Sequence, residues 1–194
     1  MMDRKSSIEA KWELIYNTHA PVLYHYGNKL TPNNQLIEDC IQDVFAELWE
    51  KRNSINNIRH IQAYLIKVFR RKVIHKLHVH RQQDTHHPYV QEIAFNISFS
   101  FESSIIQHEI CEENQKRLQK ALQLLTHRQR ETIYLKFYEG YAYDEIAEIM
   151  NLEKSAVYSF IYKAMTQLRD EMKDNHLTVD SSIGLLSLLF LFLI

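Results

Sequence analysis

The chain has 194 residues, of which 45% are apolar and 24% charged, and its net charge is -1. This composition excludes a disordered chain, and the length allows one or two small domains. Glycine and proline occur only three times each, too rarely for the turns of an all-β fold, so an all-α fold is expected. The N-terminal residues include no apolar run of signal-peptide length, which predicts a cytoplasmic protein.

The first predicted elements are two helices. Residues 12–30 have a helical pattern that ends near Thr31-Pro32. Residues 37–50 are predicted to form a strongly amphipathic helix, because apolar residues recur there at helical spacing. The apolar stripe consists of Ile37, Ile41, Val44, Phe45 and Leu48. The opposite face is polar and acidic and carries Asp39, Gln42, Asp43 and Glu50, with Trp49 at its edge.

A basic region follows, in which no acidic residue occurs from Lys51 to Gln83. The polar segment "NSINNIRH" is turn-prone, and residues 61–80 form a predicted helix with Leu65, Phe69, Val73 and Leu77 four apart. The cations of the region are Lys51, Arg52, Arg59, Lys67, Arg70, Arg71, Lys72, Lys76 and Arg81. A stretch this long without an acid favours a polyanionic partner over an ordinary solvated face.

Residues 82–112 interrupt the helical pattern with a proline and the alternating segment "FNISFSF". A structureless stretch of this length is uncommon inside one compact domain, so it predicts a flexible linker between two small helical domains. We therefore expect a first domain at 1–81, a linker at 82–112, a second domain at 113–175 and a tail at 176–194.

The second domain begins with a predicted helix whose stripe is Leu118, Ala121, Leu122 and Leu125. Thr126 and Gln129 have the spacing of a capping box, which starts a helix that ends at Gly140. A short third helix contains Tyr143, Ile146, Ala147 and Met150. A longer fourth helix contains Val157, Ile161, Ala164 and Leu168.

The stretch "DEIAEIMNLEKSAV", residues 144–157, has the spacing of a DNA-binding helix-turn-helix. Ala147 is small enough for close helix contact, Asn151 tolerates the positive φ of a turn, and Val157 points back as an apolar anchor. The exposed face of the second helix is then Ser155, Tyr158, Ser159, Tyr162 and Lys163. An ordinary helical corner can also match this pattern, but two flanking helices favour DNA binding.

No cofactor or metal site is predicted. Cys40 and Cys111 form no CxxC pair, and the histidines at 75, 78, 80, 86 and 87 are irregularly spaced. No nucleophile and base pair or phosphate loop appears either, so neither an enzyme nor a small-molecule substrate is expected. The tail segment "IGLLSLLFLFLI" is too short to span a membrane, which needs about 20 apolar residues. It can pack on the second domain, lie against a membrane or dock a partner, and packing is the simplest interpretation.

The chain resembles an RNA polymerase sigma factor of the extracytoplasmic-function (ECF) group of the sigma-70 family. Residues 125–169 resemble region 4, "IEDCIQDVFAELWEKR" resembles region 2.2, and residues 63–81 resemble regions 2.3 to 2.4. Two motifs in the right order are more specific than a lone helix-turn-helix. The resemblance implies a transcription initiation factor that binds the polymerase core, recognises promoters at two places and helps to open the duplex.

The resemblance also implies roles for particular residues. Binding of a coiled coil of the largest polymerase subunit would use Asp39, Gln42, Asp43, Phe45 and Trp49. The -10 element and the melted non-template strand would contact Asn56, Asn57, Arg59, His60, Lys67, Arg70, Arg71, Lys72 and Lys76. The duplex -35 element would contact Arg128, Arg130, Lys154, Ser155, Tyr158, Ser159 and Lys163. An anti-sigma protein is an expected further partner.

Some positions depart from the common family pattern. The usual glycine of the region 4 turn is Asn151, and the usual Ser or Thr cap of the third helix is Ala142, which weakens that helix start by about 1 kcal/mol. Tyr158 and Phe160 stand where Arg or Lys is frequent, and Arg71 stands for a common Asn. Such Tyr and Arg-Arg choices resemble the branch of the family typical of Bacteroidota.

Two other functions fit parts of the pattern. A stand-alone helix-turn-helix regulator would bind DNA without joining the polymerase core. A sigma-shaped adaptor would bind proteins and not DNA.

Overall fold

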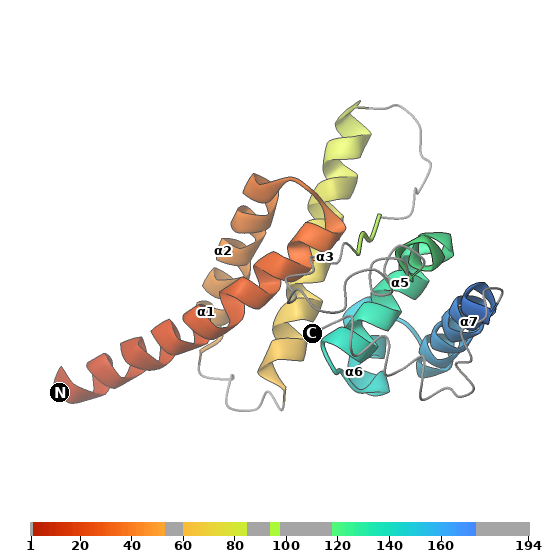
Figure 1. Ribbon diagram of the computed structural model, residues 1–194. Helices are drawn as coiled ribbons and strands as arrows, with labels where there is room; N and C mark the ends of the chain where they lie inside the picture. Colours follow the sequence, from red (N-terminus) through yellow and green to blue (C-terminus); the bar gives the residue numbers. More distant parts are fainter. Residues whose placement is uncertain (1, 53–59, 85–93, 98–117, 174–194) are drawn as a thin grey trace, which may run out of the picture. The chain divides into compact units, whose positions relative to one another are not determined.

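The computed structural model describes residues 2–52, 60–84, 94–97 and 118–173. The chain separates into two compact units, Met1–Ala94 and Phe95–Ile194. Every regular element within the described residues is a helix, as predicted (Figure 1). The predicted tail and the residues 53–59 lie outside the described residues.

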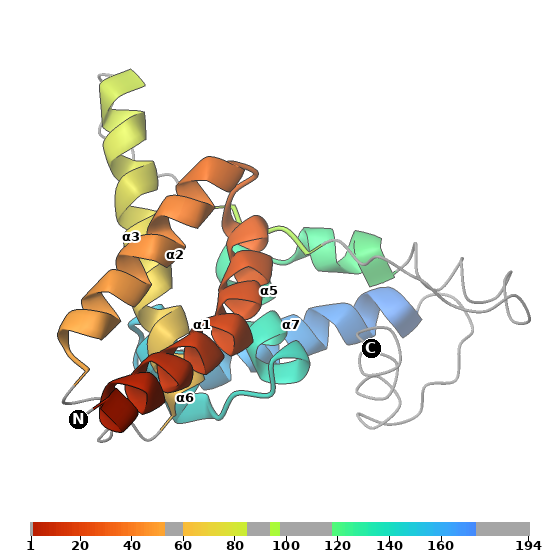
Figure 2. The ribbon, with the colours of Figure 1, turned by 90° about the vertical axis from the view of Figure 1, so that its left-hand side faces the viewer.

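In the first unit, helices α1 (Met2–Leu30), α2 (Asn34–Glu50) and α3 (Ile61–Asp84) each pack against the other two (Figures 1 and 2). Helix α2 starts three residues before the predicted position because Asn33 caps it. The side-chain oxygen of Asn33 accepts a hydrogen bond from the Leu36 N–H at 3.1 Å. Helix α3 runs four residues beyond its predicted end and so includes the first residues of the predicted linker.

The core of the first unit depends on a close approach at Gly27. A Cβ at Gly27 would lie 2.9 Å from Cγ2 of Ile37 and 3.0 Å from Cζ of Phe69, closer than real side chains allow. Glycine therefore lets α1 approach both of its neighbours. The predicted stripe of α2 is buried here, and Cys40 is buried beside it as a free thiol whose pKa is raised by desolvation.

The second unit contains a helical segment at 118–124, then α5 (His127–Ile133), a π-helix η2 (Tyr134–Tyr138), α6 (Tyr143–Met150) and α7 (Lys154–Lys173). The capping box is confirmed: Gln129 N–H donates to Thr126 Oγ1 at 3.3 Å, and Thr126 N–H donates to Gln129 Oε1 at 2.8 Å. The predicted second helix therefore begins where expected, but its last turn is a π-helix, which the periodicity did not predict.

The helix-turn-helix geometry is confirmed. Asn151 ends α6 with φ 53° and ψ 55°, the left-handed conformation that the sequence required. Ala147 and Val157 are buried, as is the predicted inner stripe of α7. Ala142 supplies no side-chain cap to α6, but its N–H donates to the carboxylate of Glu145 at 2.8 Å. This bond, with two acids in the first turn of α6, partly compensates for the missing hydroxyl.

Phe95, which was predicted to lie in the linker, is a buried residue of the second unit. The Phe95 ring is only 1% exposed and lies 5.5 Å from the ring of Tyr134. Its N–H donates to Nδ1 of His127 at 3.1 Å. Tyr134 in turn stacks on Tyr138 at 4.9 Å and donates a 2.6 Å hydrogen bond to Glu139. Burial raises the pKa of Tyr134, so its hydroxyl stays a donor.

Within the described residues, no helix is long and apolar enough to cross a membrane.

Candidate nucleic-acid and protein interfaces

The outer face of α2 carries the polar side chains predicted to bind a protein partner. Gln42, Asp43 and Trp49 are exposed, and Asp39 is half-buried and accepts a 2.9 Å hydrogen bond from Gln35. Phe45 differs from this group, because it is only 9% exposed and its ring lies 4.7 Å from that of Tyr16. Phe45 therefore supports α2 from the core, as its place in the apolar stripe implies, and offers little surface to a partner.

Trp49 is an exposed aromatic side chain held in a defined position. Its ring is 42% exposed and packs in a T-shaped arrangement with that of Trp12, with 5.0 Å between centroids. The guanidinium of Arg52 lies 5.3 Å from the ring centroid and donates to the Trp49 carbonyl at 3.2 Å. A large ring that is fixed before binding loses little conformational entropy in a complex, which suits it as an interface anchor.

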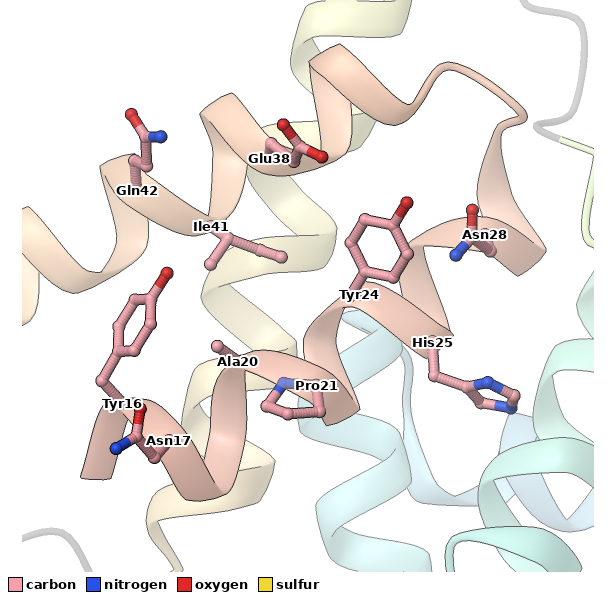
Figure 3. Close-up of a pocket in the computed structure, with 10 residues that line it drawn as sticks. All are labelled: Tyr16, Asn17, Ala20, Pro21, Tyr24, His25, Asn28, Glu38, Ile41 and Gln42. Atoms are coloured by element: carbon pink, nitrogen blue, oxygen red, sulfur yellow. The ribbon is translucent and has the colours of Figure 1, made fainter. Parts of the chain in front are cut away.

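A groove between α1 and α2 adjoins this face (Figure 3). It has a volume of about 720 Å³ and includes Gln42 among its lining residues. Ala20, Pro21 and Ile41 contribute its apolar part, and Tyr16 and Tyr24 flank it from α1. Pro21 has no N–H, so the carbonyl of Asn17 cannot receive the usual helical hydrogen bond beside the groove. The groove thus extends the polar face of α2 with the aromatic rings of Tyr16 and Tyr24.

Among the described residues, ion pairs join the acidic helix α2 to the basic helix α3. Lys76 Nζ lies 2.8 Å from Asp43 Oδ2, and Lys72 Nζ lies 3.3 Å from Glu47 Oε2. The hydrogen bond to Asp43 raises the pKa of Lys76. We call these four residues the charge ladder. Lys76, predicted to bind phosphate, and Asp43, predicted to bind protein, therefore contact each other in this structure. Lys72, also predicted to bind phosphate, contacts Glu47.

The other basic residues of α3 lie elsewhere on the helix. Lys67 and Arg71 are exposed one turn apart, and Arg70 is half-buried beside them. His60 is exposed just before α3 begins. Asn56, Asn57 and Arg59 lie outside the described residues. The exposed positions follow i, i+4 spacing, which places their cations along one side of the helix.

In the second unit, α7 presents the predicted duplex-reading side chains. Ser155, Tyr158, Ser159 and Lys163 are all exposed, and Tyr158 is 49% exposed. Lys154 is also exposed, and its ammonium lies 2.7 Å from Asp144 of α6. That ion pair joins the two helices of the helix-turn-helix at their solvent face.

Two residues that the motif did not single out lie next to Tyr158. The ring of Tyr143, in the first turn of α6, stacks on that of Tyr158 with 4.2 Å between centroids and 19° between planes. Lys136 Nζ lies 4.7 Å from the centroid of the Tyr143 ring and donates to the Tyr141 carbonyl at 3.2 Å. Helical periodicity assigns faces within one helix, so it could not reveal a contact among three elements.

Arg128 and Arg130, predicted to hold phosphate, differ in their surroundings. Arg128 is exposed in the first turn of α5, whereas Arg130 is half-buried. Arg130 Nη2 lies 3.2 Å from His127 Nδ1, and desolvation lowers the pKa of Arg130. Arg130 thus contacts His127, the residue that accepts the hydrogen bond from the Phe95 N–H, whereas Arg128 is an exposed residue.

The part of the chain that the structure describes holds no group of three or more His, Cys, Asp or Glu side chains suited to a metal ion.

Comparison with known protein families decides the identity of the two units. Residues 15–83 match the family model "Sigma-70 region 2", and residues 115–168 match "Sigma-70, region 4". The two matches together cover well over half of the chain. The chain belongs to the sigma-70 family of sigma factors. It is an ECF-type sigma factor, a transcription initiation factor that directs RNA polymerase to promoters and is not an enzyme.

Individual relatives agree with this assignment. The chain is 21% identical over 168 residues to the ECF RNA polymerase sigma factor SigX of Bacillus subtilis, covering 86% of each chain. It is 26% identical over 126 residues to the Positive control factor of the same organism, covering 63% of this chain and 72% of that one. The fold is similar to that of sigma factor RpoE from Bartonella quintana, solved with the anti-sigma factor NepR, at a TM-score of 0.59 and 21% identity. That alignment covers 86% of this sigma factor and 99% of RpoE.

Proposed function

We propose that this sigma factor binds the polymerase core through the outer face of α2, with Trp49 as the anchor and Asp39 and Gln42 beside it. The observation that carries the proposal is the fixed, exposed ring of Trp49 between Trp12 and Arg52. Tryptophans that are exposed in the free protein and become buried at the centre of a complex are frequent hot spots of protein interfaces. The groove lined by Tyr16 and Tyr24 would receive side chains of the same partner.

Promoter opening would use α3 and the segment before it. Lys67, Arg70 and Arg71 would neutralise phosphates of the melted strand, and Lys72 and Lys76 would join them if the ladder opens. The polar segment with Asn56, Asn57, Arg59 and His60 would capture an unstacked base by hydrogen bonds to its edge. These assignments rest on residue chemistry and on position in region 2.

The upstream promoter element would be bound as a duplex by α7. Ser155, Tyr158 and Ser159 can donate or accept hydrogen bonds at base edges. Arg128, Arg130, Lys154 and Lys163 would hold the phosphates that fix the register of the helix.

We also propose that the sigma factor belongs to the Bacteroidota-type branch and acts in the cytoplasm, where the polymerase is. The tyrosine at 158 and the arginine pair at 70 and 71 support the branch. An anti-sigma protein is a proposed regulator, because the similarly folded RpoE was crystallised with one.

Measuring the binding of variants to purified polymerase core tests the proposed interface. Asp39→Lys and Trp49→Ala should each weaken core binding at least about tenfold, because the first reverses a charge on the acidic face that would contact the coiled coil and the second removes the anchor. Trp49→Phe, which keeps a ring against Trp12, should lose less than Trp49→Ala. Glu171→Lys, a matched charge reversal on exposed α7, is the control. Unchanged binding of both test variants to the polymerase core would refute the proposed interface on α2.

A further inference from the structure

We propose that Tyr143 and Lys136 belong to the duplex-binding surface of this sigma factor: Tyr143 as a positioning residue for Tyr158, and Lys136 as a cation that contacts phosphate. This inference rests on the proposed contact of α7 with the upstream promoter element. It adds two residues from outside the recognition helix.

The geometry is a stack of three groups from three elements. Lys136 comes from η2, Tyr143 from α6 and Tyr158 from α7. The near-parallel rings of Tyr143 and Tyr158 have centroids 4.2 Å apart, within the range of a stacked pair. On the Tyr143 ring, Lys136 Nζ lies 4.7 Å from the centroid, a cation–π distance.

Stacking restricts a side chain that would otherwise be free. Tyr158 is 49% exposed on the outer face of α7, where a single tyrosine would sample several rotamers. Contact with Tyr143 selects one of them before DNA arrives, so less entropy is lost on binding. The Tyr158 hydroxyl is thereby held in one orientation, so it hydrogen-bonds the base edge at one position of the promoter element.

Lys136 supplies a positive charge that two positions of α7 lack. Positions 158 and 160 hold Tyr and Phe, so neither carries a charge for the phosphates. Lys136 lies beside the same ring pair and is fixed by its hydrogen bond to the Tyr141 carbonyl at 3.2 Å. A lysine held at this surface attracts phosphate without reading sequence. Lys136 therefore adds a cation from η2 to those that Lys154 and Lys163 supply from α7.

The test uses full-length chain assembled with polymerase core and a duplex carrying the upstream element that the wild-type holoenzyme selects from a random pool. Tyr143→Ala should weaken binding about two- to tenfold, the affinity equivalent of one aromatic pair, and relax preference at the base contacted by Tyr158. Tyr143→Phe keeps the ring and should behave as wild type. Tyr158→Phe keeps the stack but loses the hydroxyl, so it should lower sequence preference.

Coupling between the two tyrosines separates positioning from a general structural role. The double variant Tyr143→Ala/Tyr158→Ala should lose little more than Tyr158→Ala alone, because Tyr143 acts through Tyr158. Lys136→Met should weaken binding to all sequences alike and reduce the salt slope by about one. Fully additive losses, or a Tyr143→Ala holoenzyme with unchanged sequence preference, would overturn the positioning role, and an unchanged salt slope in Lys136→Met would overturn the phosphate contact. A wild-type holoenzyme that selects no upstream element would instead refute the proposed function.

Discussion

The region 2 and region 4 domains hold their exposed polar groups in different ways. In region 2, carboxylates of α2 hold ammonium groups of α3 through the charge ladder. In region 4, the ring of the recognition-helix tyrosine is held by another ring. Exposed ion pairs are weak and screened by salt, whereas stacking of rings is not. The comparison teaches that rising salt should release side chains of region 2 while leaving the stack of Tyr143 on Tyr158 in region 4 in place.

The largest expected effect is a loss of stability of region 4 when a buried aromatic ring is removed. Phe95→Ala removes a ring that is 1% exposed and packed on Tyr134. We expect a loss of about 3 kcal/mol in the unfolding free energy of region 4, at the low end for buried Phe because the short segment can swing away. Urea denaturation measures it. Asn96→Ala, an exposed neighbour, should change little, and equal losses from both would contradict the anchoring role of Phe95.

The next effect tests whether the stability of region 2 depends on close helix packing at Gly27, as the stability of region 4 depends on packed aromatic rings. Gly27→Ala puts a methyl group within 3.0 Å of both Ile37 and Phe69. Overpacking of this kind should cost about 1–3 kcal/mol in the stability of region 2. Thermal unfolding monitored by circular dichroism would detect it. Gly140→Ala serves as a contrast, because its cost comes from a φ of 76° and not from a clash, and would appear in region 4.

A smaller effect concerns the turn that sets α7 against α6. Asn151→Ala should cost about 1 kcal/mol or slightly more, because a left-handed φ of 53° disfavours a residue with a Cβ and no local hydrogen bond. Asn151→Gly should be neutral or slightly stabilising in the folded turn. Denaturation midpoints of the two variants compare them. Alanine as stable as glycine would show that the turn relaxes to another conformation.

The smallest expected effect on stability comes from removing the charge ladder, and it tests how region 2 responds to salt. Asp43→Asn with Glu47→Gln removes the ladder and should cost less than about 1 kcal/mol, a difference that fades at high salt. The same variant releases Lys72 and Lys76, so its DNA affinity should depend more steeply on salt, by up to about 0.9 per new phosphate contact. Titration of promoter binding from low to high salt measures the slope.

The control for this variant is Asp39→Asn, which lies outside the ladder and should leave the slope unchanged. A ladder variant with the wild-type slope would show that Lys72 and Lys76 do not reach phosphate. The effect of Tyr143→Ala, by contrast, should be the same at low and high salt.

Periodicity predicted most of the helices, because each buries one stripe along its own length. The stripes of α2 and α7, the capping box at Thr126 and the left-handed Asn151 all follow from local sequence. Phe45 shows the limit of borrowing roles from a family. Its helical position predicted burial, while the resemblance placed it at an interface, and it is 9% exposed.

Contacts between elements were not predictable in the same way. The π-helix at 134–138, the burial of Phe95 and the stack of Tyr143 on Tyr158 each depend on residues brought together from separate segments. The charge ladder is of the same kind: the acidic face and the basic helix were both evident, but not that they pair.

By itself the sequence determined that this chain folds as two helical domains and carries sigma-70 motifs in order, because helix stripes, caps and turn residues act over a few neighbouring positions. Only the tertiary structure decided which charges neutralise one another and which ring orients the recognition helix's tyrosine. These outcomes depend on distances of a few ångströms between side chains far apart in the chain, and a one-dimensional pattern does not encode such distances.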